Sequence, residues 1–334
     1  MSKDMGRFGI LTVAPDVLVS EEAVQTITGD YVEALKSLGG VPWTEEDLID
    51  PAPLFLLVVT GGSENVILRV QAERESHIPN EPVLLIAHPA NNSLPAALEV
   101  LARLQQDGER GRIFYLKGPD DEAGLQQIVE AVQNLAVRRT LQEARIGLMG
   151  DPSDWLVASM PDPATVKATW GPDVVPIAME DITQAMAQVT NGTLRPILDT
   201  LKADATEVHE PTEEDMRDVT RVYAAVRHLV DAYNLDAVTV RCFDLVLNLE
   251  TTGCFGLAQL TDEGIIAGCE GDLVSTVGLL WAYKLLDKIP WMANPAQLDE
   301  AANAMWLAHC TVPRRMVESY RLRSHFESGL GVGI

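Results

Sequence analysis

The chain has 334 residues, enough for two domains of ordinary size. Its 47% hydrophobic and 22% charged residues are typical of a globular protein and exclude an intrinsically disordered one. The net charge of −24 argues against nucleic acid as a partner and against binding to anionic membrane surfaces, because both need clusters of Lys and Arg.

Neither export nor membrane insertion is indicated by the sequence. Residues 1–7 lack the apolar core of a signal peptide, and no uninterrupted apolar run approaches the roughly 18 residues of a membrane span. A low cysteine content without an export signal predicts a cytoplasmic protein. The cysteines form no CxxC pair, which excludes a zinc knuckle and a thioredoxin-type motif; they are Cys242, Cys254, Cys269 and Cys310.

In the first part of the chain, short apolar runs alternate with amphipathic segments. Buried strands are predicted at 8–13, 54–60, 83–88 and 112–116, and helices at 20–38, 94–106 and 120–140, with a further helix opening at Glu64. Repeated alternation of this kind predicts a parallel sheet with helices on both faces.

The alternation restarts at Arg145, which divides the chain into an N-terminal α/β domain over 1–142 and a second α/β domain over 143–334. Further strands are predicted at 174–178, 237–243 and 304–310, and further helices near 180–190, 211–233 and 273–286. We therefore expect two doubly wound, Rossmann-like domains, each with three layers and a largely parallel sheet.

Two loops of the first domain follow predicted strands and carry polar side chains. The loop 60–64 places two glycines and Ser63 between a strand and a helix, which suits either a tight turn capped by Ser63 or contact with a sugar or an acidic group. Asn92 lies in a similar loop, where it suits either turn formation or recognition of sugar hydroxyls. Both residues are candidates for substrate binding.

The strongest functional signal lies in the segment 265–286. An apolar run ends at Glu270 and Asp272, and a mostly apolar helix follows. Ligands of open α/β sheets bind beyond such strand ends, and neighbouring carboxylates there are costly unless a cation or a proton compensates them. Glu250 lies on the preceding loop, so these acids could share one hard divalent cation. Asp272 alone would equally suit a helix N-cap.

Three further side chains are candidates for the same site. Trp155 follows the first strand of the second domain, where it suits either the face of a sugar or an anchor in the core. His309 ends the predicted strand 304–310 and is either a hydrogen-bonded core residue or a metal ligand and proton carrier. Arg241 lies at a strand end, where it could neutralise charge on a substrate. A Ser-His-Asp hydrolase is not supported, because the sequence has no GxSxG motif.

The segments 268–272, 288–295 and 306–313 together resemble the L-fucose isomerase/L-arabinose isomerase family, and more closely its shorter fucose isomerase-like branch. The resemblance implies a metal-dependent aldose–ketose isomerase that acts on a sugar or sugar derivative through an ene-diolate, with Mn²⁺ or another divalent cation. It implies Glu250 and Asp272 as catalytic residues. We take Glu250, Asp272 and His309 as the metal ligands, and the substrate-binding candidates are Arg241, Glu270, Ser63, Asn92 and Trp155.

The chain departs from this family at its C-terminal end. It stops at the point where the family's β-barrel domain, which supplies a metal-binding His, would begin. We expect His309 or His325 to replace that ligand, or a partner chain to supply the missing barrel, and the resemblance implies a homo-oligomer. The alternative is a non-catalytic sugar-binding or assembly subunit that retains the isomerase fold.

Overall fold

The computed structural model describes residues 6–15, 20–203 and 205–334. Residues 1–5, part of the segment considered above for an export signal, lie outside these ranges. The chain divides into two compact units, Met1–Ala136 and Val137–Ile334. The boundary expected after residue 142 falls a few residues later, within the last turns of helix α4 (Glu122–Glu143).

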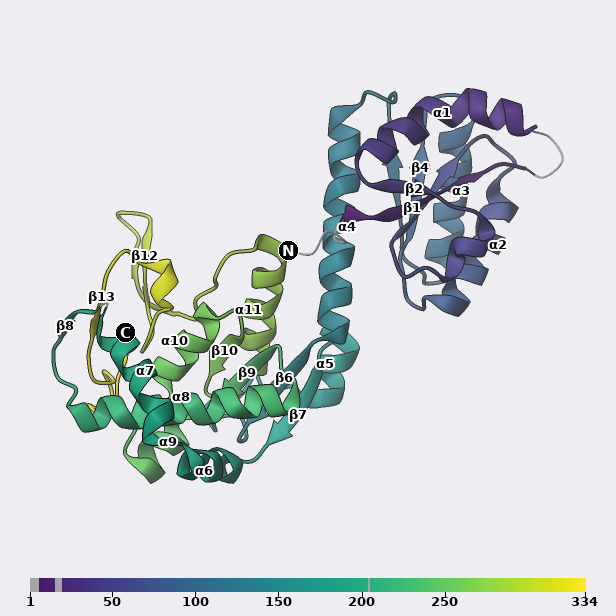
Figure 1. Ribbon diagram of the computed structural model, residues 1–334. Helices are drawn as coiled ribbons and strands as arrows, with labels where there is room; N and C mark the ends of the chain where they lie inside the picture. The colour runs from purple at the N-terminus through teal and green to yellow at the C-terminus, as the bar shows by residue number, and fades with distance from the viewer. Residues whose placement is uncertain (1–5, 16–19, 204) are drawn as a thin grey trace. The chain divides into compact units, whose positions relative to one another are not determined.

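The first unit is built on a five-stranded sheet of parallel strands in the order β2-β1-β3-β4-β5. Figure 1 labels β1, β2 and β4 of this sheet. The strands are β1 (Phe8–Val13), β2 (Gly40–Pro42), β3 (Leu54–Val58), β4 (Val83–Ala87) and β5 (Gly111–Tyr115). The helices are α1 (Glu21–Ser37), α2 (Glu64–His77), α3 (Ser93–Gln106) and the first part of α4, with the short 3-10 helix η2 (Glu45–Ile49).

Helices cover both faces of this sheet. Leu35 of α1 and Ile128 of α4 pack on one face, and Ile67 of α2 and Val100 of α3 pack on the other. Every residue of β3 and β4 is buried, because both strands lie between the two helical layers. The expected three-layer architecture is therefore confirmed.

The second unit has a four-stranded parallel sheet in the order β10-β9-β6-β7 (Figure 1). Its strands are β6 (Arg145–Met149), β7 (Asp173–Ile177), β9 (Ala237–Val240) and β10 (Ile266–Cys269). One face packs against α6 (Met179–Gln188), α7 (Asn191–Ala203), α8 (Glu213–Tyr233), α9 (Cys242–Leu249) and α10 (Cys254–Asp262). The other face packs against α5 (Pro163–Trp170), α11 (Leu273–Leu286) and the end of α4.

Two small strand pairs complete this unit. β8 (Ala205–Val208) pairs with β13 (Tyr320–Leu322) in parallel, and β11 (Asn294–Asp299) pairs with β12 (Ala304–Ala308) as an antiparallel hairpin. The 3-10 helix η3 (Arg314–Met316) lies between β12 and β13. Among the described helices, none combines the length and apolarity needed to cross a bilayer.

Two expected strands differ from those observed. The strand expected over 237–243 ends at Val240, and helix α9 begins at Cys242. The run expected as a buried strand at 304–310 forms β12, whose residues are all exposed; the Trp306 side chain is 65% exposed. Short apolar runs do not distinguish a strand from a helix, nor a core strand from an exposed one.

Arg74 holds part of the first unit together from a buried position, with only 4% of the residue exposed. Its guanidinium donates hydrogen bonds to both carboxylate oxygens of Glu81, at 2.6 and 3.0 Å. It also donates to the backbone carbonyls of Leu48, Asp50 and Ala52. Arg74 therefore links α2 to η2 and to the segment between η2 and β3.

We expect Arg74→Met to lower the free energy of unfolding by about 3–5 kcal/mol, because it leaves a largely buried carboxylate and three carbonyls without this donor. Arg69→Met is the matched control on the same helix, since Arg69 forms an exposed ion pair with Glu45 and should cost less than about 1 kcal/mol. Urea unfolding of both variants measures the difference. Equal losses would contradict a special role for Arg74.

Candidate active site

Three loops of the second unit meet at the carboxyl edge of its sheet. The strands β6, β9 and β10 are neighbours and run parallel, so the segments that follow them emerge at the same edge. The chain continues from β6 to β7 on one side and returns to β9 on the other, which makes the β6/β9 junction a topological switch point. Ligands of open α/β sheets bind in the crevice outside such a junction.

Arg241 ties two of these loops together. Its guanidinium donates to the Asp244 carboxylate at 3.0 Å, to both Asp154 oxygens at 3.2 Å, and to the Pro152 carbonyl at 2.6 Å. The two carboxylates raise the pKa of Arg241, with Asp244 as the larger cause. Arg241 lies at a strand end, as the sequence predicted, and its positive charge is already paired with Asp154 and Asp244.

Glu270 connects the third loop to the first. Its carboxylate oxygen Oε2 accepts a hydrogen bond of 2.7 Å from the Trp155 indole, and its backbone carbonyl accepts one of 2.8 Å from the Ser153 amide. Glu270 is half-buried, with a left-handed backbone at φ 66°. Trp155 is 52% exposed and packs its ring edge-on against Phe243, 5.1 Å between centroids. A carboxylate and an accessible indole thus lie side by side at this edge.

Asp272 is the N-cap of α11. Its Oδ1 accepts from the Ser275 amide at 2.8 Å, and its Oδ2 accepts from the Ser275 hydroxyl at 2.7 Å. The residue is 7% exposed. Of the two readings that the sequence allowed for Asp272, the capping one describes its contacts here, and a cap of this kind stabilises a helix by about 1 kcal/mol.

Glu250 and His309 take no part in the hydrogen bonds described for Arg241, Glu270 and Asp272. Glu250 is exposed and ends α9 in a left-handed conformation at φ 51°. His309 follows the exposed strand β12, is partly buried, and lines a small apolar pocket together with Trp291 and Thr311. In the described ranges, Glu250, Asp272 and His309 do not form a group whose ligand atoms all lie within 4.8 Å of one another. These three expected ligands of Mn²⁺ are therefore not brought together in this structure.

The two candidates from the first unit have structural contacts. Ser63 is fully buried, and its hydroxyl donates to the carbonyls of Thr60 and Val13 at 2.7 and 3.2 Å. Asn92 is exposed and precedes α3 with a left-handed backbone at φ 56°, a conformation that Asn tolerates well. Ser63 thus fixes the turn after β3, whereas the Asn92 side chain remains accessible.

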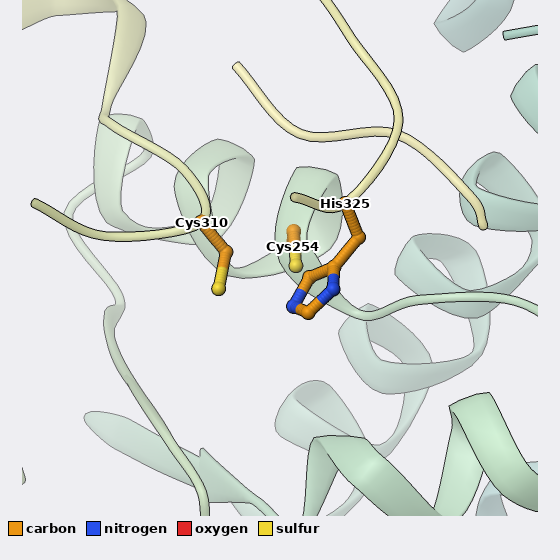
Figure 2. Close-up of side chains that lie close together, drawn as sticks. All are labelled: Cys254, Cys310 and His325. Atoms are coloured by element: carbon orange, nitrogen blue, oxygen red, sulfur yellow. The ribbon is translucent and has the colours of Figure 1, made fainter. Parts of the chain in front are cut away.

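Within the described residues, the group with donor atoms close enough to hold a metal ion is Cys254, Cys310 and His325. Cys254 opens α10, Cys310 follows β12, and His325 follows β13; Figure 2 shows both sulfurs and the imidazole turned toward a common space. The hydrogen bond with Cys254 and the neighbouring His325 lower the pKa of the Cys310 thiol, and Cys310 in turn raises the pKa of His325.

Sequence reasoning considered His325 as a metal ligand but missed its partners Cys254 and Cys310, with which it forms a thiol–imidazole cluster. The sequence does not pair the two cysteines in a CxxC motif, and the three residues come from separate segments that only the fold brings together. The other two cysteines lie close by: the sulfurs of Cys242 and Cys269 are 2.9 Å apart, and both residues are buried. The usable signal was the restriction of all four cysteines to the last third of the chain.

The cluster is linked to the sheet edge through aromatic rings. The His325 ring meets Phe243 edge-on, 5.9 Å between centroids, and Phe243 meets Trp155 in the same way. Trp155 in turn donates to Glu270. The Trp155–Glu270 pair and the thiol–imidazole cluster therefore belong to one continuous region.

No known protein-family model matches the chain. It is similar to curated proteins named sulfoquinovose isomerase. The relative from Priestia aryabhattai is 20% identical over 201 residues, covering 59% of this chain and 44% of the relative. The relative from Clostridium sp. (strain MSTE9) is 24% identical over 234 residues, covering 69% of this chain and 52% of the relative. The chain spans about half the length of these curated relatives.

Proposed function

We propose that this protein is an aldose–ketose isomerase whose substrate binds at the carboxyl edge of the second sheet. The similarity to sulfoquinovose isomerases carries the proposal, because it extends over 59–69% of the chain. The edge geometry supports it: Trp155 offers an accessible aromatic face, and Glu270 offers a carboxylate beside it. These are the groups that a sugar ring and its reacting carbon–hydrogen bond require.

The substrate class is a sugar or sugar derivative. Sulfoquinovose, the sugar in the relatives' name, carries an anionic sulfonate, and its recognition calls for a cationic or strongly donating partner. Arg241 is paired with Asp154 and Asp244, so this guanidinium does not offer an uncompensated charge at the edge. We therefore include neutral aldoses beside sulfoquinovose as candidate substrates.

Aldose–ketose isomerisation requires a group that removes a proton from C2 of the open-chain aldose and returns it to C1. A second proton moves between the oxygens on C1 and C2. We assign the carbon-to-carbon transfer to Glu270, because it lies at the strand end with one oxygen held by Trp155. Its Oε1 accepts no hydrogen bond from any described residue. Glu250, for which the family resemblance implies this role, is the competing assignment. Mn²⁺ has no part in this assignment, since Glu250, Asp272 and His309 are not brought together.

The test is an isomerase assay on the purified full chain with sulfoquinovose, L-fucose, L-arabinose and D-glucose, each followed by NMR detection of the ketose and of deuterium uptake at C2. Each sugar is measured in metal-free buffer and again with added Mn²⁺ or Zn²⁺. Ketose formation from at least one sugar is the expected result. Sugar binding without turnover under every condition would instead support the non-catalytic, sugar-binding subunit.

A further inference from the structure

The thiol–imidazole cluster has the donor set of a transition-metal site. We propose that Cys254, Cys310 and His325 bind one divalent cation of the Zn²⁺ type, with a fourth coordination position left for water or a substrate oxygen. The inference rests on this cluster alone and does not depend on the proposed isomerase activity.

The spacing of the donors is compatible with one ion. The two sulfur atoms and the imidazole nitrogen all lie within 4.8 Å of one another. Around a tetrahedral Zn²⁺, with bonds of about 2.3 Å to sulfur and about 2.0 Å to nitrogen, donors lie roughly 3.5–3.8 Å apart. Closing the cluster onto an ion therefore needs movements of no more than about 1 Å, which side-chain rotation provides.

Burial makes a cation favourable at this position. Cys254 is 2% exposed and His325 is 3% exposed, whereas Cys310 is only partly buried. Sulfur donors bind metals as thiolates, and a buried thiolate is unfavourable without a positive partner. A divalent ion supplies that charge. The partial exposure of Cys310 leaves a side from which an ion and its water can enter.

Neighbouring groups hold the donors in place, as is usual around metal ligands. The Ser328 amide donates to Nδ1 of His325 at 3.2 Å, and the Ser328 hydroxyl lies 3.1 Å from the same nitrogen, so that Nε2 is the nitrogen left for the sulfurs. With an ion on Nε2, the ring proton occupies Nδ1, the Ser328 hydroxyl accepts it, and the amide contact opens. Thr252, two residues before Cys254, is fixed by the Val332 amide, which donates to its hydroxyl at 3.2 Å.

Two buried hydroxyls close to the cysteines in sequence have no hydrogen-bond partner among the described residues. Thr311, 7% exposed, directly follows Cys310, and Thr251, 2% exposed, lies three residues before Cys254. Leaving such hydroxyls unsatisfied costs about 1–3 kcal/mol each. A water on the fourth position of the ion would bring a hydrogen-bonding partner into this region.

The donor types select the metal. Two thiolates and one imidazole favour Zn²⁺ over Mn²⁺, which prefers carboxylate, carbonyl and water oxygens. Three protein donors with an open position are typical of catalytic zinc sites, whereas structural sites have four. The contact between His325 and Phe243 places this ion one aromatic ring away from Trp155.

The experiment uses the full chain, reduced, stripped of metal by chelator, and freed of any His-tag. Zn²⁺ is titrated against a chromophoric chelator, and Co²⁺ binding is followed through its thiolate-to-metal absorption in the near ultraviolet. We expect one ion per chain, a Co²⁺ spectrum with two thiolate ligands, and preference for Zn²⁺ over Mn²⁺ by at least 100-fold in affinity.

Substitutions distinguish the proposed metal ligands from neighbouring residues that do not bind the ion. Cys310→Ser and His325→Gln should each weaken Zn²⁺ binding by at least 100-fold, and Ser328→Ala by about 10-fold or more, since it removes only a group that orients His325. Cys269→Ser is the control, because Cys269 is a buried cysteine outside the donor set, and this variant should bind Zn²⁺ as the parent does. Circular dichroism checks that each variant is folded.

Two results would overturn the proposal. One is the absence of stoichiometric Zn²⁺ or Co²⁺ binding by the reduced, folded chain. The other is binding that survives Cys310→Ser or is lost equally in Cys269→Ser. Formation of a Cys254–Cys310 disulfide by a mild oxidant in a chain that binds no metal would identify the cluster as a thiol pair instead. The test measures metal binding and not turnover. A chain without isomerase activity can therefore still confirm or contradict the proposed metal site.

Discussion

Gly271→Ala is expected to destabilise the second unit by about 2–4 kcal/mol, which corresponds to a fall in melting temperature on the order of 10 °C. Gly271 has a backbone φ of +72°, where an L side chain is strained. A Cβ there would lie 2.7 Å from the Pro152 Cα and 2.9 Å from the Asp151 carbonyl oxygen. Both neighbours are backbone atoms, so the loops after β6 and β10 would have to separate.

The matched control for this substitution is Gly278→Ala in the helix that follows. No atom lies within 4 Å of a Cβ built at Gly278, which is exposed in α11. Alanine there should be neutral or stabilising by up to about 1 kcal/mol, because it favours the helix. Thermal unfolding followed by circular dichroism measures both variants. A Gly271→Ala protein as stable as the parent would show that the two loops are not in close contact.

Gly271 also illustrates what could be learned from the sequence about this edge. The apolar runs that begin at Arg145, Ala237 and Ile265 predicted parallel strands, although the second strand ends earlier than expected, and parallel strands deliver their following loops to one edge. That rule alone was enough to bring Trp155, Arg241 and Glu270 to the same region. It could not predict that Trp155 donates to Glu270, or that Asp154 and Asp244 neutralise Arg241, because such pairings depend on loop conformation.

The roles of individual acids were harder to predict for a physical reason. Asp272 precedes an apolar helix, and the sequence left open whether it caps that helix or binds a ligand. In the structure, both carboxylate oxygens of Asp272 accept hydrogen bonds from Ser275. Local hydrogen bonds of this kind compete with ligand binding for the same lone pairs. The sequence alone does not show whether the Asp272 carboxylate is used by the helix cap or by a ligand.

The thiol–imidazole cluster marks the limit of spacing arguments. Cys254, Cys310 and His325 are brought together by the hairpin β11–β12 and the returning strand β13, which lie outside the main sheet. Their proximity depends on where β13 pairs, and it pairs with β8, a strand far earlier in the chain. Periodicity within a segment carries no information about such distant pairing.

Glu270→Gln is the substitution with the largest expected effect on catalysis. We expect kcat to fall about 100-fold or more with little change in KM, since glutamine cannot carry a proton between the two sugar carbons. The Gln carbonyl oxygen can still accept the 2.7 Å hydrogen bond from Trp155, so the loop and its stability should be preserved. Exchange of the C2 proton with solvent deuterium should fall in parallel.

Glu250→Gln is the discriminating comparison, and Glu318→Gln, at an exposed position outside the site, is the control for surface charge. If Glu270 moves the proton, Glu250→Gln retains the rate of C2 exchange within a few-fold, while Glu270→Gln loses it. The reverse pattern would return the role to Glu250 and leave Glu270 as a contact for Trp155. Because both variants remove one negative charge, a difference between them reports the position of the carboxylate relative to the reacting carbon and not the charge of the protein.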